Sequence, residues 1–504
     1  MNAAYDELKE RLAEIADLGK AGSILGWDQQ TMMPPRGAPV RAEQMATLGR
    51  IAHEKFTSDE IGRLLDQLEG FESSMPYESD EASLVRVTRT DWEKARRVPS
   101  ELRAELTRQA SLALPVWIDA RERSDFKSFL PALRTNLDLR RRYIECFEPA
   151  ENPYDIVLDD FERGMTTAEV SVVFDRIKAE QGQLIADLRD RAADTDPLRG
   201  SFPTERQKQF ELSVVERFGF DRASWRLDPT VHPFASGGAI NDIRITTRYI
   251  QDSLEGLFAT MHETGHGLYE HGVAPELERT PLARGVSLGL HESQSRLWEN
   301  LVGRSLPFWR FFYPSLKETF PEALEGMELE DFYPRVNTVR PSLIRVEADE
   351  ATYNMHIILR FELEQEILNG TVALEELPEA WGARIDEYLG IDVPDDRRGV
   401  LQDVHWAGGH IGYFPTYALG NVVSAQIWER ILVDVPDLYD QFERGEFGEL
   451  RGWLRENLHR HGRKFTPKET IERVCGGPLD PEPYLRYLRD KLGGIFGLAT
   501  TTAR

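Results

Sequence analysis

Apolar residues recur along most of this chain of 504 residues at the spacing of an α-helix. Positions three and four apart share one side of a helix, so this spacing predicts amphipathic helices with one buried face. Residues 2–22 show it first, through Tyr5, Leu8, Leu12, Ile15 and Leu18. The same pattern predicts helices around 101–145, 167–193, 251–270, 286–303, 346–368 and 421–432.

Alternation of apolar and polar residues, which is typical of a half-buried strand, is rare. The clearest case is 239–247, where Ile243 and Ile245 alternate with polar neighbours. The pair Gly237 and Gly238 before this segment is typical of a turn. We therefore expect a mostly α-helical protein with one small β-sheet.

Nothing in the sequence divides the chain into separate domains. The segments 70–82 and 194–204 are predicted to be polar loops, and neither has the composition of a linker. No internal repeat of solenoid length is found. We expect a single domain over 1–504, arranged as two lobes around a cleft.

Composition narrows the class of protein. The chain has 86 acidic and 61 basic residues, a net charge of −25, which argues against binding nucleic acid or an anionic membrane. No apolar run is long enough to cross a membrane, and the first residues lack the pattern of a signal peptide. Two cysteines, Cys146 and Cys475, exclude a disulfide framework and fit the reducing cytoplasm.

The strongest chemical signal is the H-E-x-x-H sequence at 262–266, inside a predicted helix. His262 and His266 lie one turn apart on the same face, so both imidazoles can reach one Zn²⁺. Glu263 lies beside them, where it can act as general base on a metal-activated water. Gly265 and Gly267 lower helix propensity, which suggests close approach of another backbone or of a ligand.

A catalytic zinc also needs a third protein ligand and an open coordination position. The residues that follow His266 do not supply the third histidine of the metzincin sequence, so this ligand must come from further along the chain. Glu292, on the next predicted helix, is our first choice because two histidines and a glutamate are common in peptidases. Glu299 and His291 are the alternatives.

Further blocks along the chain resemble the carboxypeptidase Taq family of metallocarboxypeptidases, peptidase family M32. H-E-x-x-H alone is shared by many families, but the ordered set of blocks makes this resemblance specific. Gln30 stands where we expect the family's Glu. The matching blocks are 26–35, H-P-F at 232–234, D-x-R-x-T at 242–246, 262–266, H-E-S-Q at 291–294, 345–350, Q-D-x-H-W at 402–406, and 412–417.

The resemblance implies a saddle-shaped, almost wholly helical fold with a deep groove, similar in architecture to neurolysin and angiotensin-converting enzyme. It implies a zinc-dependent carboxypeptidase that removes C-terminal amino acids from peptides with broad specificity, with Co²⁺ as a possible alternative metal. It favours His262, His266 and Glu292 as the metal ligands, inside a site spanning 232–417. It also implies a cytoplasmic homodimer.

The matched blocks also contain candidates for stabilising the oxyanion of the transition state. These are His405, Tyr413 and Tyr417. Aromatic packing beside Phe414 is the structural alternative for the two tyrosines, and a core imidazole or an orienting partner of a ligand is the alternative for His405. Asp403 is expected to hold a ligating imidazole rather than to bind the metal.

A carboxypeptidase must recognise a free C-terminal carboxylate, and arginine does this best by bidentate hydrogen bonding. Arg345 is our choice because it lies in a matched block, on what we expect to be one helix with Tyr353. An intrahelical pair with Asp349 is its structural alternative. The competing candidates are Arg340, Arg244 and Arg248.

Asp242 and Arg244 lie on the predicted strand and are expected either to pair with each other or to shape the edge of the groove. An extended substrate could add to this strand through main-chain hydrogen bonds.

Two other functions stay open at this point. One is a helical zinc oligopeptidase or dipeptidyl carboxypeptidase, which differs in how many residues it releases. The other is a non-enzymatic protein with a structural metal or a peptide-binding surface. Structural zinc is usually enclosed by cysteine and histidine alone, and both cysteines are remote from the histidine cluster in sequence, which disfavours this last function.

Overall fold

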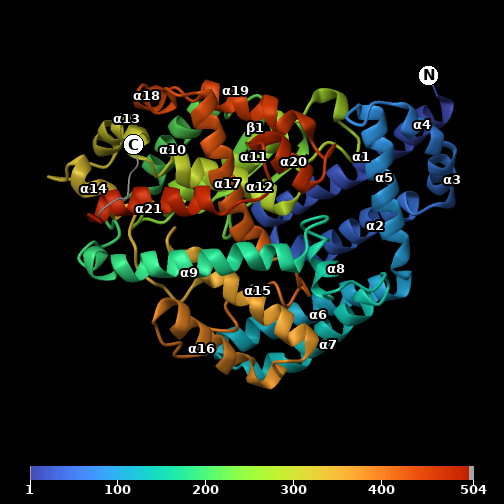
Figure 1. Ribbon diagram of the computed structural model, residues 1–504, viewed down its shortest axis with the longest axis horizontal. Helices are drawn as coiled ribbons and strands as arrows, with labels where there is room; N and C mark the ends of the chain where they lie inside the picture. The colour runs from blue at the N-terminus through green and yellow to red at the C-terminus, as the bar shows by residue number, and fades with distance from the viewer. Residues whose placement is uncertain (1, 499–504) are drawn as a thin grey trace.

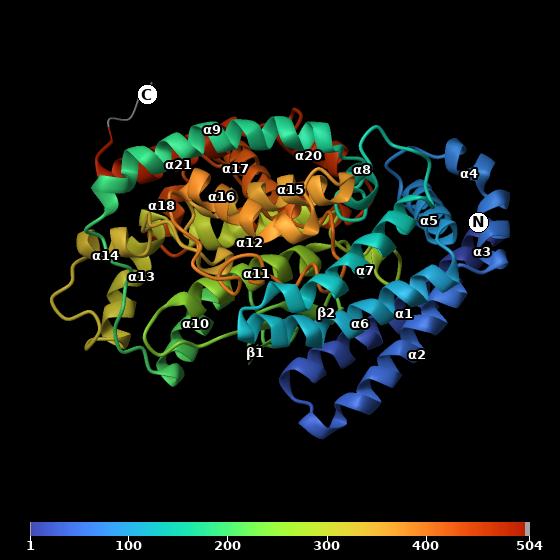
Figure 2. The same cartoon turned by 90° about the horizontal axis from the view of Figure 1, so that it is seen from below.

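The computed structural model describes residues 2–498 and confirms a mostly helical protein with one small sheet. The helices before the sheet are α1 (Ala3–Thr31), α2 (Ala38–Phe56), α3 (Asp59–Gln67), α4 (Glu69–Ser74), α5 (Asp80–Arg97), α6 (Ser100–Arg123), α7 (Phe126–Ile144), α8 (Tyr154–Leu158), α9 (Thr167–Ala192) and α10 (Thr204–Phe218). Helices α1 to α5 gather at one end of the molecule (Figures 1 and 2).

The helices after the sheet build the centre and the opposite end, where α13 and α14 lie (Figures 1 and 2). They are α11 (Glu255–Gly272), α12 (Leu288–Arg296), α13 (Leu306–Thr319), α14 (Leu329–Arg335), α15 (Tyr353–Asn369), α16 (Leu377–Leu389), α17 (Pro415–Asp434), α18 (Leu438–Glu443), α19 (Gly448–Asn457), α20 (Pro467–Cys475) and α21 (Glu482–Phe496). None of the helices within 2–498 has the length and apolarity needed to cross a membrane.

The sheet corrects one prediction. The segment 239–247 is not one strand after a glycine turn: Gly237 and Gly238 lie inside strand β2 (Ala235–Ala239), which forms a hairpin with β3 (Asp242–Thr247). The glycines are there for close packing, because a Cβ at Gly237 would lie 2.7 Å from the carbonyl oxygen of Asp242. Strand β1 (Trp225–Pro229) pairs in parallel with the other side of β3.

Two helix boundaries also differ from prediction. Helix α4 occupies the first half of the expected loop 70–82, and only a short segment separates it from α5. The expected helix 346–368 begins only at Tyr353, because Asp349 accepts hydrogen bonds from the backbone N–H groups of Ala351 and Thr352. Arg345 lies before this helix, in a separate 3₁₀ turn.

Helix α17 lies between the two large hydrophobic clusters of the protein. Leu419 and Val422 belong to the cluster formed with α7, α9, α15 and α16. Val423 and Ile427 belong to the cluster formed with α10, α11, α13 and α19. A helix that is apolar on all sides must be enclosed by protein, so α17 joins both halves of the core.

Glycines set the spacing of the three central helices. A Cβ at Gly265 of α11 would lie 2.6 Å from the Cα of Ser295 on α12. A Cβ at Gly420 of α17 would lie 2.6 Å from the Cγ of Glu292, on the other side of α12. The expected close approach of a second backbone to Gly265 is therefore confirmed, and it brings α12 against the H-E-x-x-H turn.

Gly265→Ala should destabilise the protein by roughly 1–3 kcal/mol, because the added methyl group meets backbone atoms that cannot rotate away. Thermal denaturation measures this loss. Gly182→Ala on α9 is the matched control, since a Cβ there meets nothing within 4 Å, and it should be neutral or stabilising. Equal stability of the two variants would contradict the packing described here.

A buried carboxylic acid supports the first turns of α11. Glu211 on α10 accepts a hydrogen bond of 2.6 Å from the hydroxyl of Thr260, but its second carboxyl oxygen has no partner among the described residues. Burial raises the pKa of Glu211 to about 8 from 4.5. Below pH 4.5 the group is neutral in both states, and between these two values only the unfolded state ionises. The free energy of unfolding therefore falls as pH rises through this interval.

Glu211→Gln should remove this pH-dependent loss and raise the melting temperature at pH 8, by roughly 1–3 °C. The gain should shrink towards pH 5. Glu205→Gln, an exposed position on the same helix, controls for the change in net charge. A gain that does not depend on pH would show that Glu211 is ionised in the folded protein.

Candidate active site

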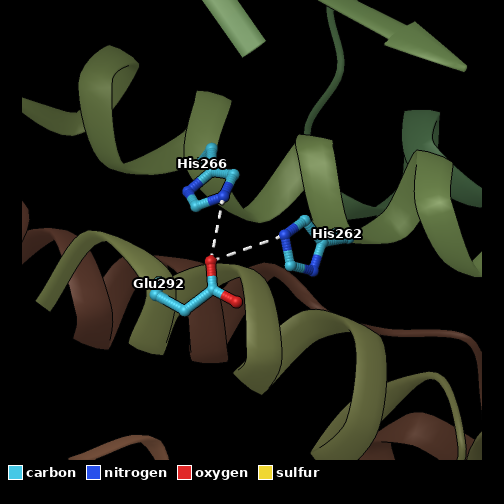
Figure 3. A group of neighbouring side chains, drawn as sticks. All are labelled: His262, His266 and Glu292. Atoms are coloured by element: carbon cyan, nitrogen blue, oxygen red, sulfur yellow. Dashed lines mark ion pairs between the residues drawn. The ribbon is translucent and has the colours of Figure 1, made fainter. Parts of the chain in front are cut away.

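Two histidines of α11 and one glutamate of α12 point at a common position (Figure 3). The Nε2 atoms of His262 and His266 lie 3.6 and 3.5 Å from the same oxygen, Oε2 of Glu292. Each residue can offer one ligand atom, and these atoms lie within 4.8 Å of one another. Two imidazole nitrogens and a carboxylate oxygen in this arrangement fit a divalent metal.

The carboxylate of Glu292 is held in its ionised form. Its Oε1 accepts a hydrogen bond of 2.8 Å from Arg296, one turn further along α12. Burial alone would raise the pKa of Glu292, but Arg296, His262 and His266 hold it well below its ordinary value. A buried, charged carboxylate facing two imidazoles is suited to bind a cation.

Glu299 is not in the three-residue cluster but lies directly behind it. Helix α12 continues into a π-helical segment, Leu297–Val302, which turns Glu299 towards His262. Its Oε2 is 2.9 Å from Nδ1 of His262, whereas Glu292 approaches Nε2 of the same ring. Arg296 also contacts Glu299, at 3.2 Å. Glu299 therefore orients the imidazole of His262, which is a common role for carboxylates around metal sites.

His266 has a corresponding partner in His291. Their Nδ1 atoms lie 2.6 Å apart, and Nε2 of His291 lies 2.9 Å from Oε1 of Glu270. If His266 presents the lone pair of Nε2 to a metal, its Nδ1–H donates to His291, whose Nε2–H donates to Glu270. This order fixes both tautomers. Burial lowers the pKa of His266 to about 4, which keeps it neutral as a ligand must be.

Glu263 lies in the same helical turn as the histidines and is buried. Burial raises the pKa of its carboxyl group to about 7, with the nearby charges of Glu292 and Glu299 adding to the effect. A carboxyl group that titrates near neutral pH is suited to take up a proton and release it again.

The block 402–417 forms a wall near Glu292, whose charge acts on Tyr413 and Tyr417, and a buried glutamate orders this wall. Glu364 of α15 accepts hydrogen bonds from the indole N–H of Trp406, the backbone N–H of Gly412 and the hydroxyl of Tyr154, at 2.8, 2.9 and 2.7 Å. The loop between Trp406 and Gly412 is therefore anchored at both ends to α15.

This wall presents the three predicted transition-state donors together. Nε2 of His405 lies 3.1 Å from the hydroxyl of Tyr417, and the rings of Tyr413 and Tyr417 are 5.4 Å apart. Burial lowers the pKa of His405 to about 3, so it is a neutral imidazole. Burial raises the pKa of both tyrosines, and the charge of the nearby Glu292 raises it further.

Arg345 lies at one end of this wall, with Tyr417 4.9 Å above its guanidinium. Its Nε and Nη2 donate to Asp403 at 3.0 and 2.8 Å, and its Nη1 donates to the hydroxyl of Tyr353 at 3.0 Å. The suggested intrahelical pair with Asp349 is wrong, because no helix joins the two residues. Two of the five N–H donors of Arg345 have no partner among the described residues.

Asp403 does not hold a ligating imidazole as we expected. It is enclosed between Arg345 and Arg360, and Arg360 donates to its Oδ2 through Nε at 2.7 Å. Burial alone would raise the pKa of Asp403, but the two guanidinium groups hold it far below the ordinary value. The carboxylate therefore fixes Arg345 in place instead.

Asp242 and Arg244 form the predicted pair, through two hydrogen bonds of 2.9 and 3.0 Å. The guanidinium of Arg244 lies 4.5 Å from the ring of Trp27 on α1, so the pair fixes the sheet against this helix. Addition of an extended substrate to β3 is excluded, because β1 and β2 already pair with both of its edges.

A helical fold in which H-E-x-x-H and a glutamate from the next helix surround one position defines a class of metallopeptidase. The comparisons with known proteins identify the family. The model for "Carboxypeptidase Taq (M32) metallopeptidase" matches residues 7–492, so the chain belongs to this family. It is a metallocarboxypeptidase, as the sequence predicted.

Relatives match over the whole chain. Thermostable carboxypeptidase 1 of Thermus thermophilus is 42% identical over 98% of this chain and 99% of its own. Carboxypeptidase 1 of Bacillus subtilis is 36% identical over 97% of this chain and 98% of its own length. The crystal structure of the M32 carboxypeptidase from Deinococcus radiodurans has a TM-score of 0.94 at 41% identity, covering 99% of this chain and 100% of that one.

Sequence reasoning missed several residues around the site. His291 and Glu299 were considered only as rival ligands, and Arg296, Glu270 and Glu364 were not considered at all. The spacing of Glu292, Arg296 and Glu299 at intervals of four and three was a usable signal, since it places all three on one helical face. No sequence pattern connects His291 with Glu270 or Glu364 with Gly412.

Glu299→Gln should weaken metal binding by about 10–100-fold, because an amide cannot accept from His262 as strongly as a carboxylate. Glu292→Ala should weaken it more, since a direct ligand is lost. Calorimetric titration of the metal-free variants with zinc compares their affinities for the metal. A larger loss of affinity in the Glu299 variant would make Glu299 the direct ligand and Glu292 the supporting residue.

Proposed function

We propose that this metallocarboxypeptidase uses zinc, with cobalt as a possible alternative, held by His262, His266 and Glu292. The observation that carries this proposal is the meeting of these three side chains within 4.8 Å. Each one also has a hydrogen-bonding partner on its far side, which supports a preorganised site. When bound, the metal would polarise the scissile carbonyl and make a water molecule more acidic.

Around that metal the chain's own residues divide the remaining work. Glu263 takes the proton of the attacking water and passes it to the leaving amine, a role that a pKa of about 7 supports. His405, Tyr413 and Tyr417 supply hydrogen-bond donors for the negative charge that develops on the carbonyl oxygen. Their grouping on one wall supports this role.

The free C-terminal carboxylate of the peptide binds Arg345 in this proposal. Asp403 and Tyr353 hold the guanidinium rigidly, and two N–H donors are left for a ligand. A fixed fork of donors is well suited to bind a carboxylate. Asp242 and Arg244 contribute by fixing the sheet beside α11.

We also propose a single catalytic domain with two lobes, a cytoplasmic location and a homodimer. The shared helix α17 supports one domain. The two free cysteines support a reducing compartment. The homodimer rests on the resemblance to the family.

The proposed activity is tested on an N-terminally blocked peptide, supplied as free acid and as C-terminal amide. Mass spectrometry should show stepwise loss of single residues from the free acid only, abolished by a chelator and restored by zinc or cobalt. Glu263→Gln should retain the metal and lower turnover by roughly 10²–10⁴-fold. Release of residues in pairs would indicate a dipeptidyl carboxypeptidase, and cleavage of both peptide forms would indicate an endopeptidase.

A further inference from the structure

An open cavity of about 760 Å³ adjoins the candidate active site. It is lined by α5, by the segment 159–163 and by the segment 284–288 before α12. Two of its lining residues contact the site itself. His291 stacks on His266 at 4.6 Å between ring centroids, and Phe161 packs against Tyr413 at 5.0 Å. The cavity therefore lies next to the residues that surround the candidate metal site.

The cavity and Arg345 lie on opposite sides of the metal-binding cluster. A series of side-chain contacts connects His262 with Arg345. His266, one turn later on α11, instead contacts His291, which lines the cavity. The first series runs from His262 through Glu299, Arg296 and Tyr353 to Arg345.

The residues of the 402–417 wall follow the same order, from Arg345 towards the cavity. Tyr417 lies over Arg345, and Tyr413, four residues before it, packs on Phe161, which lines the cavity. A peptide whose C-terminal carboxylate binds Arg345 therefore extends its preceding residues into the cavity. This step rests on the function proposed above.

Within residues 2–498, one cation that lines the cavity has a side chain that no carboxylate or carbonyl oxygen binds. Among the lining residues, Lys94 pairs with Asp159 and Asp160, and Arg463 pairs with Asp91 at 2.8 Å. The remaining acid, Glu270, is engaged by His291 and by the backbone N–H of Gly285.

Arg284 differs from these residues. Its side chain is exposed to the solvent of the cavity and makes no hydrogen bond or ion pair with any residue in 2–498. Arg103, the other lining arginine without a carboxylate, donates instead to the carbonyl of Ala95. The cavity walls and the neighbouring Arg463 lower the pKa of Arg284 to about 10, so the side chain stays charged at neutral pH.

We propose that Arg284 binds an acidic side chain of the peptide substrate, at a residue on the N-terminal side of the scissile bond. A carboxylate at that position can accept hydrogen bonds from the N–H groups of the Arg284 guanidinium, which bind no other residue within 2–498. The preference is local, because the net charge of −25 favours basic peptides at long range. The residue thus selects among peptides by sequence rather than by total charge.

The test uses blocked peptides with one C-terminal residue and a single Glu or Gln placed in turn at each preceding position. The wild-type enzyme should show kcat/KM about fivefold higher for Glu than for Gln at one position, and the ratio should fall in high salt. Arg284→Gln should abolish the ratio and leave kcat/KM for the Gln peptides unchanged. Arg284→Glu should invert it in favour of Gln, because a second carboxylate repels the Glu peptide.

Arg63→Gln, an exposed site on α3, is the matched control for loss of one positive charge and should keep the preference. Hydrolysis without any positional preference would overturn the role of Arg284 and leave the proposed activity intact. Inhibition by inorganic phosphate that Arg284→Gln relieves, without a Glu preference, would also overturn it and assign the arginine to free anions.

Binding to the Glu263→Gln variant, followed by fluorescence anisotropy of labelled peptides, tests Arg284 independently of turnover. Tighter binding of the Glu peptide that is lost in the double variant with Arg284→Gln supports the inference even if hydrolysis fails. Equal binding of the Glu and Gln peptides would overturn it.

Discussion

The close contact between α11 and α12 is the constraint on which the rest of the site depends. Gly265 allows the backbone of α12 to lie against the turn that carries both histidines, and Gly420 allows α17 to support α12 from behind. A carboxylate and two imidazoles can meet at one position only because these backbones approach so closely. The glycines lower helix propensity, and the packing of α17 between both hydrophobic clusters compensates for this.

Around this contact the protein buries many charges, and nearly all of them act in pairs or triads. Glu292 and Glu299 share Arg296, and Asp403 is shared by Arg345 and Arg360. Removing one member of such a group leaves an uncompensated buried charge, which costs several kcal/mol. These groups therefore define fixed positions for His262 and Arg345. Arg284, in the open cavity, is a lining cation whose side chain binds no residue within 2–498.

Much of the site could be predicted because its signals are local. The H-E-x-x-H turn needs only helical periodicity, and the ordered blocks, with their resemblance to a known family, pointed to Glu292, Arg345 and the 402–417 wall. The errors concern Asp349, which is expected to pair with Arg345, and Asp403, which is expected to hold a ligating imidazole. Asp349 instead accepts hydrogen bonds from the backbone N–H groups of Ala351 and Thr352 just before α15, and Asp403 pairs with Arg345, a residue distant in the chain.

The sequence by itself determined the helical class, the H-E-x-x-H turn with its two histidines, and the type of reaction, because each depends on residue types at short, regular spacing. Only the tertiary structure decided that Glu299 supports His262, that His291 supports His266, and that Arg284 faces a cavity without an acidic partner. These facts depend on how segments distant in sequence pack against each other. Helical periodicity specifies which face of a helix is buried, but not which side chain of another helix it meets.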